Sequence, residues 1–124
     1  MRSIEIISIP VTDQQRAKQF YLDLGFEVMI EAPFAQGAPS ESGGAQWIQM
    51  GLPGAKMPSI TLVTWFQDMP PGCIDGLVIK TDDVARDVAA LRAKGHDAEV
   101  AKETPWGLFA TVKDPDGNRI SLHQ

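Results

Sequence analysis

Few side chains of this chain could act as a nucleophile, a general base or a metal ligand. The 124 residues include two histidines, His96 and His123, and a single cysteine, Cys73. Cys73 has no partner for an intramolecular disulfide, and no base lies near it in its segment rich in proline and glycine. We therefore expect a reduced, non-catalytic thiol. His96 follows a glycine that should end a helix, which favours a surface position. His123 comes two residues after Ser121 in an expected strand, so both side chains should point to one side of it.

Composition and charge argue against several classes of partner. The hydrophobic share of 44% and the charged share of 22% are typical of a soluble globular protein. The formal net charge of -5 argues against nucleic acid and against an anionic membrane surface, and would suit a cationic ligand. The sequence has no apolar run long enough to span a membrane, and its start lacks the form of a signal peptide. We expect a cytoplasmic protein.

An apolar strand, a helix-capping aspartate and a helix-ending glycine occur twice in the sequence, in the same order and with the same spacing. Asp13 and, later, Asp83 each follow an apolar strand and offer a side-chain oxygen that caps a helix. Gly25 and Gly95 each end that helix in the left-handed conformation that glycine tolerates best. One such unit would bury too little apolar surface to be stable alone. The two units should therefore share a core or pack on the units of a second chain.

We predict one domain over 1–124, with a strand–helix–strand–strand–strand module at 1–66, a linker at 67–75 and a second module at 76–124. The expected strands lie at 4–11, 26–31, 46–50, 59–65, 76–81, 98–101, 108–112 and 119–123. The segment 32–44 is rich in proline, glycine and serine and has no counterpart in the second unit. It is either a lid or specificity loop or a tolerated surface loop.

Several motifs of the chain resemble the vicinal oxygen chelate superfamily, which holds glyoxalase I, bleomycin-resistance proteins, fosfomycin-resistance enzymes and extradiol dioxygenases. The resemblance implies an α+β fold of two tandem βαβββ modules that form a half-barrel around a cleft. It also implies a homodimer with exchanged or facing modules. The motifs are Val11-Thr12-Asp13, Phe20-Tyr21, Leu24-Gly25-Phe26, Trp106-Gly107 and Asp114-Pro115-Asp116-Gly117-Asn118.

Enzymes of this superfamily hold a divalent metal through His, Glu or Gln, two ligands from each module. The resemblance places the four ligand positions on Ile6, Thr61, Gly76 and Ser121. Such an ion needs carboxylate, imidazole or thiolate ligands, which none of the four supplies. We therefore expect no metal, no other cofactor and no catalytic residue of the family's kind.

Strand alternation, counted from those four positions, predicts which residues line the cleft. They combine aromatic rings, hydroxyls, an amide and cations, which is the usual composition of a small-molecule pocket. The predicted ligand-binding residues are Ser8, Trp47, Gln49, Thr61, Lys80, Trp106, Phe109, Thr111, Ser121 and His123. The alternative is that aromatic residues such as Trp47 and Phe109 fill a closed core.

Three functions remain open at this point. The first is a metal-free protein that binds a small aromatic or amphipathic molecule in the cleft, as bleomycin-resistance proteins do. The second is a glyoxalase-like lyase or isomerase, or a dioxygenase, with a non-standard site in which His123 or Lys80 acts as general base. The third is a non-catalytic structural or regulatory module whose cleft is closed. The sequence leaves open whether the chain is an enzyme. The lack of metal-ligating side chains at the four positions favours the first function.

Overall fold

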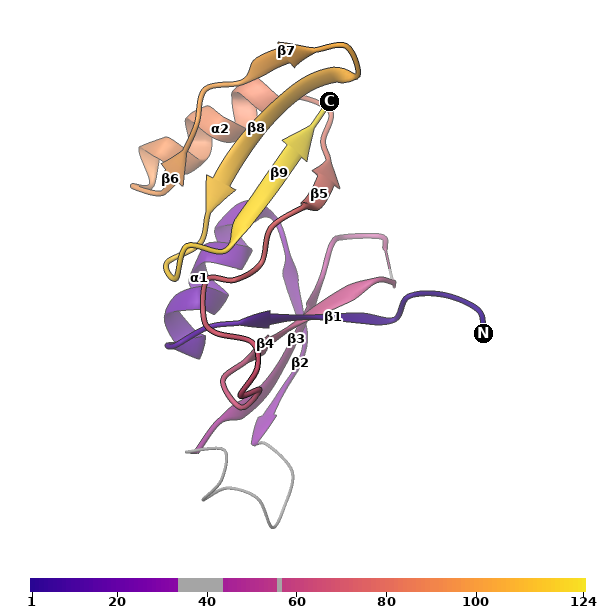
Figure 1. Cartoon of the computed structure of the whole chain (residues 1–124), viewed down its shortest axis with the longest axis vertical. Helices are drawn as coiled ribbons and strands as arrows, with labels where there is room; N and C mark the ends of the chain where they lie inside the picture. The colour runs from indigo at the N-terminus through magenta and orange to yellow at the C-terminus, as the bar shows by residue number, and fades with distance from the viewer. Residues whose placement is uncertain (34–43, 56) are drawn as a thin grey trace.

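Each half of the chain forms one β-sheet with one helix packed against it (Figure 1). The structure is a computed structural model that describes residues 1–33, 44–55 and 57–124. The first sheet has the order β1-β4-β3-β2, with β1 parallel to β4 and the other neighbours antiparallel. Its elements are β1 (Ile6–Pro10), α1 (Gln14–Leu24), β2 (Glu27–Pro33), β3 (Gln46–Gly51) and β4 (Ser59–Val63).

The second sheet has the corresponding order, β5-β9-β8-β6, with β7 also paired to β8. Again the first strand is parallel to the last. Its elements are β5 (Leu77–Lys80), α2 (Val84–Ala93), β6 (Asp97–Ala98), β7 (Lys102–Thr104), β8 (Gly107–Lys113) and β9 (Arg119–His123). The predicted α+β class is confirmed. Most of the predicted segment 32–44 lies outside the described residues.

Both helices begin at the aspartates that the sequence predicts. The side chain of Asp13 accepts a hydrogen bond from the backbone nitrogen of Arg16 at 3.1 Å, and Asp83 does the same for Arg86 at 3.0 Å. Each bond satisfies a backbone donor that the first turn of a helix leaves free. Gly25 ends α1 with a φ of 113°, in the left-handed region, as predicted.

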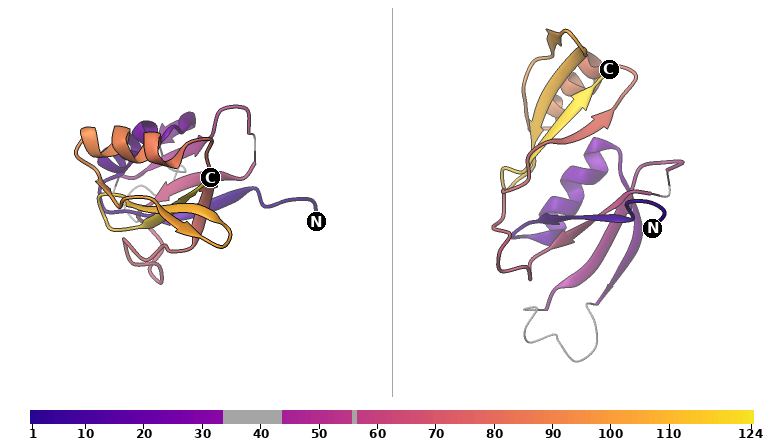
Figure 2. Two further views of the ribbon diagram at one scale, coloured as in Figure 1. Left: turned by 90° about the horizontal axis from the view of Figure 1, so that it is seen from above. Right: turned by 45° about the vertical axis from the view of Figure 1, so that its right-hand side comes forward.

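The two helices lie on the same side of the molecule, with the sheets on the other side (Figure 2). The helix-facing residues of both sheets and the apolar stripes of both helices form one buried core. Its largest fully buried side chains include Tyr21, Phe20, Ile9, Ile48 and Met50. The opposite face of each sheet carries no helix of its own half. We call these surfaces the first open face (β1, β4, β3) and the second open face (β5, β9, β8, β7).

A buried polar cluster joins the two halves on the helix side. The Tyr21 hydroxyl on α1 donates to Asp114 at 2.9 Å, in the turn between β8 and β9. Asn118 Nδ2 donates to the carbonyl of Pro10 at 2.8 Å and to Asp114 at 2.7 Å. Burial and the neighbouring Asp114 carboxylate raise the pKa of Tyr21 far above its ordinary value, so the hydroxyl remains a donor. The Asp-Pro-Asp-Gly-Asn turn thus fixes how the halves meet.

The strand predicted at 98–101 is wrong in its extent. The structure has a strand, β6, that ends at Ala98, and a second one, β7, that begins only at Lys102, and both pair with β8. Between them the amide of Glu99 still donates to the carbonyl of Thr111 at 2.9 Å. The next residue, Val100, faces solvent and is 66% exposed. The chain leaves the ladder at Val100 and returns at Lys102, which splits the edge of the sheet.

Candidate ligand-binding site

The first open face has a row of polar side chains across its three central strands. Ser8 on β1 is the partner of Thr61 on β4, which is in turn the partner of Gln49 on β3. Because partners across a ladder point to the same side of a sheet, these three predicted site residues lie together. Thr61 Oγ1 donates to Ser8 Oγ at 3.3 Å, and Gln49 Nε2 donates to Ser59 Oγ at 2.9 Å. Thr61 is only 1% exposed, so its hydroxyl supports Ser8 rather than meeting a ligand directly.

An aromatic group adjoins this polar row. Trp47 Nε1 donates to Gln49 Oε1 at 3.2 Å, which fixes the indole beside the row. Trp65 stacks on Trp47, with ring centroids 6.4 Å apart and planes 26° apart. Phe66 meets Trp65 edge-on at 6.1 Å. Trp65 was not among the predicted site residues, although alternation from Thr61 through Val63 would have placed it on this face.

The second open face has a row of four residues, one from each of its strands. Lys80 on β5 is the partner of His123 on β9, His123 is the partner of Phe109 on β8, and Phe109 is the partner of Lys102 on β7. The next row holds Ser121 and Thr111, which are also partners. The structure therefore brings together all the residues predicted from these strands and adds Lys102. Lys102 could not be found from sequence because the split edge strand sets its register.

His123 is held in place by two contacts. Its ring stacks on Phe109 with centroids 4.4 Å apart and planes 15° apart. Its Nε2 lies 2.8 Å from the carbonyl oxygen of Trp106, so this nitrogen is the donor. Gly107, with a φ of 118°, makes the approach possible: an added Cβ would lie 2.6 Å from the Gln124 carbonyl and 2.9 Å from His123 Nε2. Trp106 itself is 78% exposed.

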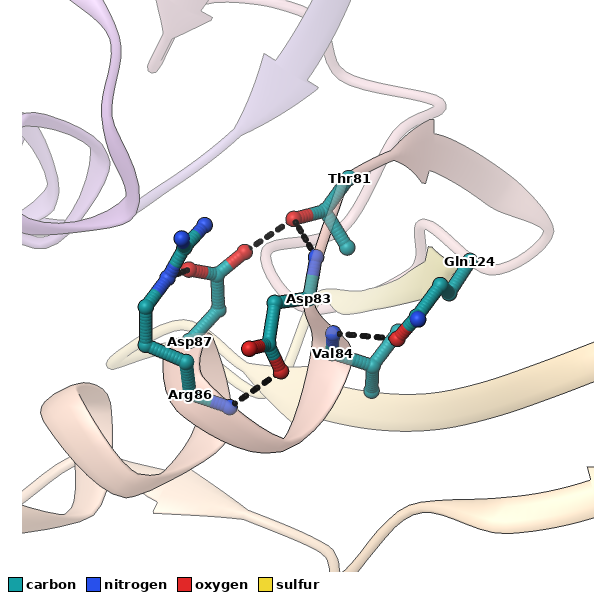
Figure 3. A network of polar contacts seen from close by, with 6 residues as sticks. All are labelled: Thr81, Asp83, Val84, Arg86, Asp87 and Gln124. Atoms are coloured by element: carbon teal, nitrogen blue, oxygen red, sulfur yellow. Dashed lines mark hydrogen bonds and ion pairs between the residues drawn. The ribbon is translucent and has the colours of Figure 1, made fainter.

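The ends of β5 and β9 are anchored to the start of α2 (Figure 3). Thr81, which follows Lys80, donates its hydroxyl to Asp87 and accepts from the amide of Asp83 at 3.3 Å. Gln124, which follows His123, accepts from the amide of Val84 at 3.0 Å. These bonds tie the residues that follow Lys80 and His123 to the first turn of α2. Lys80 and His123 therefore each precede a residue that is anchored to α2.

Two hollows lie where the halves of the chain meet. A hollow of about 260 Å³ is lined by apolar residues of β1, β4 and β5, by Phe26 and by residues between β3 and β4, and it reaches Lys80. A larger one of about 640 Å³ lies on the helix side between α1, the end of α2 and the turn after β8. In it His96 Nε2 donates to Asp23 at 2.8 Å, which, with smaller contributions from Gln19 and Lys94, holds the pKa of Asp23 below its ordinary value. His96 is thus half-buried in a contact between the halves rather than free on the surface.

The four positions that the resemblance gives to metal ligands do not fit a metal. Ile6 and Gly76 have no donor atom in their side chains. Thr61 is buried and bonded to Ser8, and Ser121 offers one neutral hydroxyl. No group of three or more His, Cys, Asp or Glu residues is arranged to hold a metal within the described residues. We therefore derive no reaction step through a metal ion.

The comparisons with known proteins agree with this architecture. The sequence model of the Glyoxalase/Bleomycin resistance protein/Dioxygenase superfamily matches residues 3–122. The structure is similar to TnmS3, an antibiotic binding protein from Streptomyces sp. CB03234, with 40% identity and a TM-score of 0.88 over 100% of this chain and 96% of that one. A glyoxalase/bleomycin resistance protein from the same strain is 41% identical with a TM-score of 0.82, over 98% and 100% of the two chains.

A further relative has a lower sequence identity to this chain than the two Streptomyces proteins. The uncharacterized protein YetH of Bacillus subtilis (strain 168) is 25% identical over 100% of this chain and 99% of its own length. No helix of the described residues is long and apolar enough to cross a membrane.

The family match and the similar structures confirm the fold predicted from the sequence motifs over nearly the whole chain.

Proposed function

Because the chain belongs to the Glyoxalase/Bleomycin resistance protein/Dioxygenase superfamily, we propose that it binds a planar aromatic small molecule on its open faces without using a metal ion. The observation that carries the proposal is the pairing of aromatic rings with fixed polar groups on each face. The first face offers Trp47 beside Gln49, and the second offers Phe109 stacked on His123. Flat rings bind well to such surfaces because stacking adds to the burial of apolar area.

The similarity to an antibiotic binding protein supports binding over chemistry. TnmS3 is described by its title as binding an antibiotic, and it matches this chain over nearly the whole of both sequences. Metal-dependent members of the superfamily need ligands that this chain lacks at Ile6, Thr61, Gly76 and Ser121. A binding protein needs aromatic surfaces for stacking and a few hydrogen-bonding groups, and the open faces offer both.

We further propose that the complete site is formed by two copies of the chain. Both helices cover one side of the molecule, so the two open faces point to the other side rather than toward each other (Figure 2). A ligand held by stacking on one face would leave its other surface in water. A second copy could bring its second open face over the first open face of its partner. That arrangement would enclose the ligand between aromatic groups of both chains.

The test is a titration with a neutral planar probe, naphthalene-2-carboxamide. We expect it to quench tryptophan fluorescence saturably and to raise the melting temperature, because it binds only the folded protein. Trp47→Leu should weaken binding by about tenfold, since stacking and burial of one aromatic face are lost. Leu22→Ala, on the exposed side of α1, is the matched control and should leave binding unchanged. Binding that is equally tight in the Trp47 variant would contradict the site.

A further inference from the structure

We infer that the ligand of the second open face is a planar aromatic molecule that carries an anionic group, recognised by Lys80 and Lys102. The inference rests on the proposed function and specifies its ligand class. It starts from the row Lys80–His123–Phe109–Lys102, in which consecutive members are direct partners across four strands. The two stacked rings lie at the centre of this row, and a lysine lies at each end.

The two lysines have no acidic partner in the part of the chain that the structure describes. The salt bridges found there involve other cations, namely Lys18, Arg86, Lys94, His96 and Arg119. Glu103, next to Lys102, is the partner of Leu108 and so points to the opposite side of the sheet. Glu99 lies opposite Thr111, one row further along the strand, and forms none of these salt bridges. The end of the face that holds the rings therefore carries two unpaired positive charges.

The geometry of the row suits an acid attached to a ring. A ring that continues the Phe109–His123 stack lies against the outer face of one of the two rings, with its plane across the row. A ligand ring on the outer face of His123 lies next to Lys80, and one on the outer face of Phe109 lies next to Lys102. A carboxylate or phenolate there would accept charge-assisted hydrogen bonds, which are stronger than those between neutral groups. The local charge of this face runs opposite to the net charge of -5 of the whole chain.

The first open face should discriminate little between ligands of different charge. Its central side chains, Ser8, Gln49, Thr61 and Trp47, are all uncharged. They can bind the ring and neutral polar substituents of either kind of ligand. Discrimination between an acid, an amide and an amine of the same shape should therefore come from the two lysines.

The experiment compares three probes of one shape: naphthalene-2-carboxylate, naphthalene-2-carboxamide and 2-(aminomethyl)naphthalene. Their affinities for the full chain are measured by titration calorimetry at low and at high salt. We expect the carboxylate to bind about threefold to tenfold more tightly than the amide, and the amine most weakly, since exposed ion pairs contribute modestly. The preference should shrink at high salt, because mobile ions screen exposed charges.

Two variants assign the preference to residues. Lys80→Met combined with Lys102→Met should abolish the preference, so that the double variant binds the carboxylate no more tightly than the amide. Arg92→Met, which removes an exposed cation from α2, is the matched control and should keep the preference. Equal affinity of the acid and the amide for the wild-type chain would overturn this inference while leaving the proposed function intact. A preference that survives in the double variant would overturn it too. Failure of all three probes to bind would overturn both.

Discussion

At the residue scale, the polar cluster around Asp114 explains why a charged side chain is buried between the halves. Asp114 is 5% exposed and accepts hydrogen bonds from the Tyr21 hydroxyl, from Asn118 Nδ2 and from the amides of Asp116 and Asn118. A buried carboxylate is tolerated only when donors surround it in this way. The turn sequence supplies most of these donors itself, and α1 supplies the hydroxyl.

Replacing Tyr21 by Phe tests this cluster. The variant keeps the ring in the core but removes one donor from a buried carboxylate. We expect the free energy of unfolding to fall by about 1–3 kcal/mol, the usual cost of a lost hydrogen bond to a buried charged group. Urea denaturation monitored by circular dichroism measures the change. A variant as stable as the wild type would show that the hydroxyl is not needed at Asp114.

The pair formed by Asp23 and His96 predicts how stability depends on pH. The hydrogen bond from His96 lowers the pKa of Asp23 in the folded chain. A carboxyl with a lowered pKa stabilises the fold above its unfolded pKa, and this contribution disappears as pH falls through the folded value. The difference in unfolding free energy between wild type and Asp23→Asn should therefore shrink below about pH 4. Urea titrations from pH 5.5 down to 2.5 measure it, and a constant difference would contradict the assignment.

Sequence reasoning found most residues of both faces because strand alternation needs only local information. Phe109, Thr111, Ser121 and His123 lie on one face, as predicted. The sequence did not predict the features that depend on contacts between distant segments. The burial of Thr61 follows from its position between two strands, and the stacking of Trp65 on Trp47 joins residues from different elements. Whether the predicted residues bind a ligand remains a prediction.

At the scale of elements, the two helix starts are the best-predicted parts of the chain. A cap is encoded by one residue type at one position, so it can be read directly from sequence. The edge of the second sheet shows the opposite case. No residue in 99–101 signals that Val100 leaves the ladder, because the register of β6 and β7 is set by their pairing with β8.

The caps can be compared between the two halves. Asp13→Ala and Asp83→Ala should each lower the free energy of unfolding by about 1 kcal/mol, since each leaves one helix donor unsatisfied. The conservative changes Asp13→Asn and Asp83→Asn should recover most of that loss, because the amide oxygen can still accept. Chemical denaturation of the four variants gives the comparison. Asparagine variants as unstable as the alanine variants would rule out a capping role.

At the scale of the whole molecule, the position of the helices determines what the open faces can do. With both helices on one side, the faces of both sheets in a single chain lack a cover of helices on the other side (Figure 2). Aromatic side chains on such a surface are often contact sites for another molecule. This is the structural reason for proposing two copies of the chain.

A second copy can be tested directly in solution. We expect sedimentation equilibrium to give twice the chain mass of 13.5 kDa at micromolar concentration. A change from Trp106 to Glu should favour the monomer, because this exposed ring lies at the rim of the second open face. The Arg92→Met variant should remain a dimer. A wild-type chain that stays monomeric up to about 100 μM would contradict the two-chain site.

The central claim is that this chain binds a planar aromatic molecule without a metal ion. Its most direct test is titration calorimetry with naphthalene-2-carboxylate on protein treated with a chelator, repeated after Zn²⁺, Mn²⁺ or Fe²⁺ is added back. The account predicts saturable binding to the chelated protein and an affinity that none of these ions changes. Binding that appears only when a metal ion is restored would contradict it.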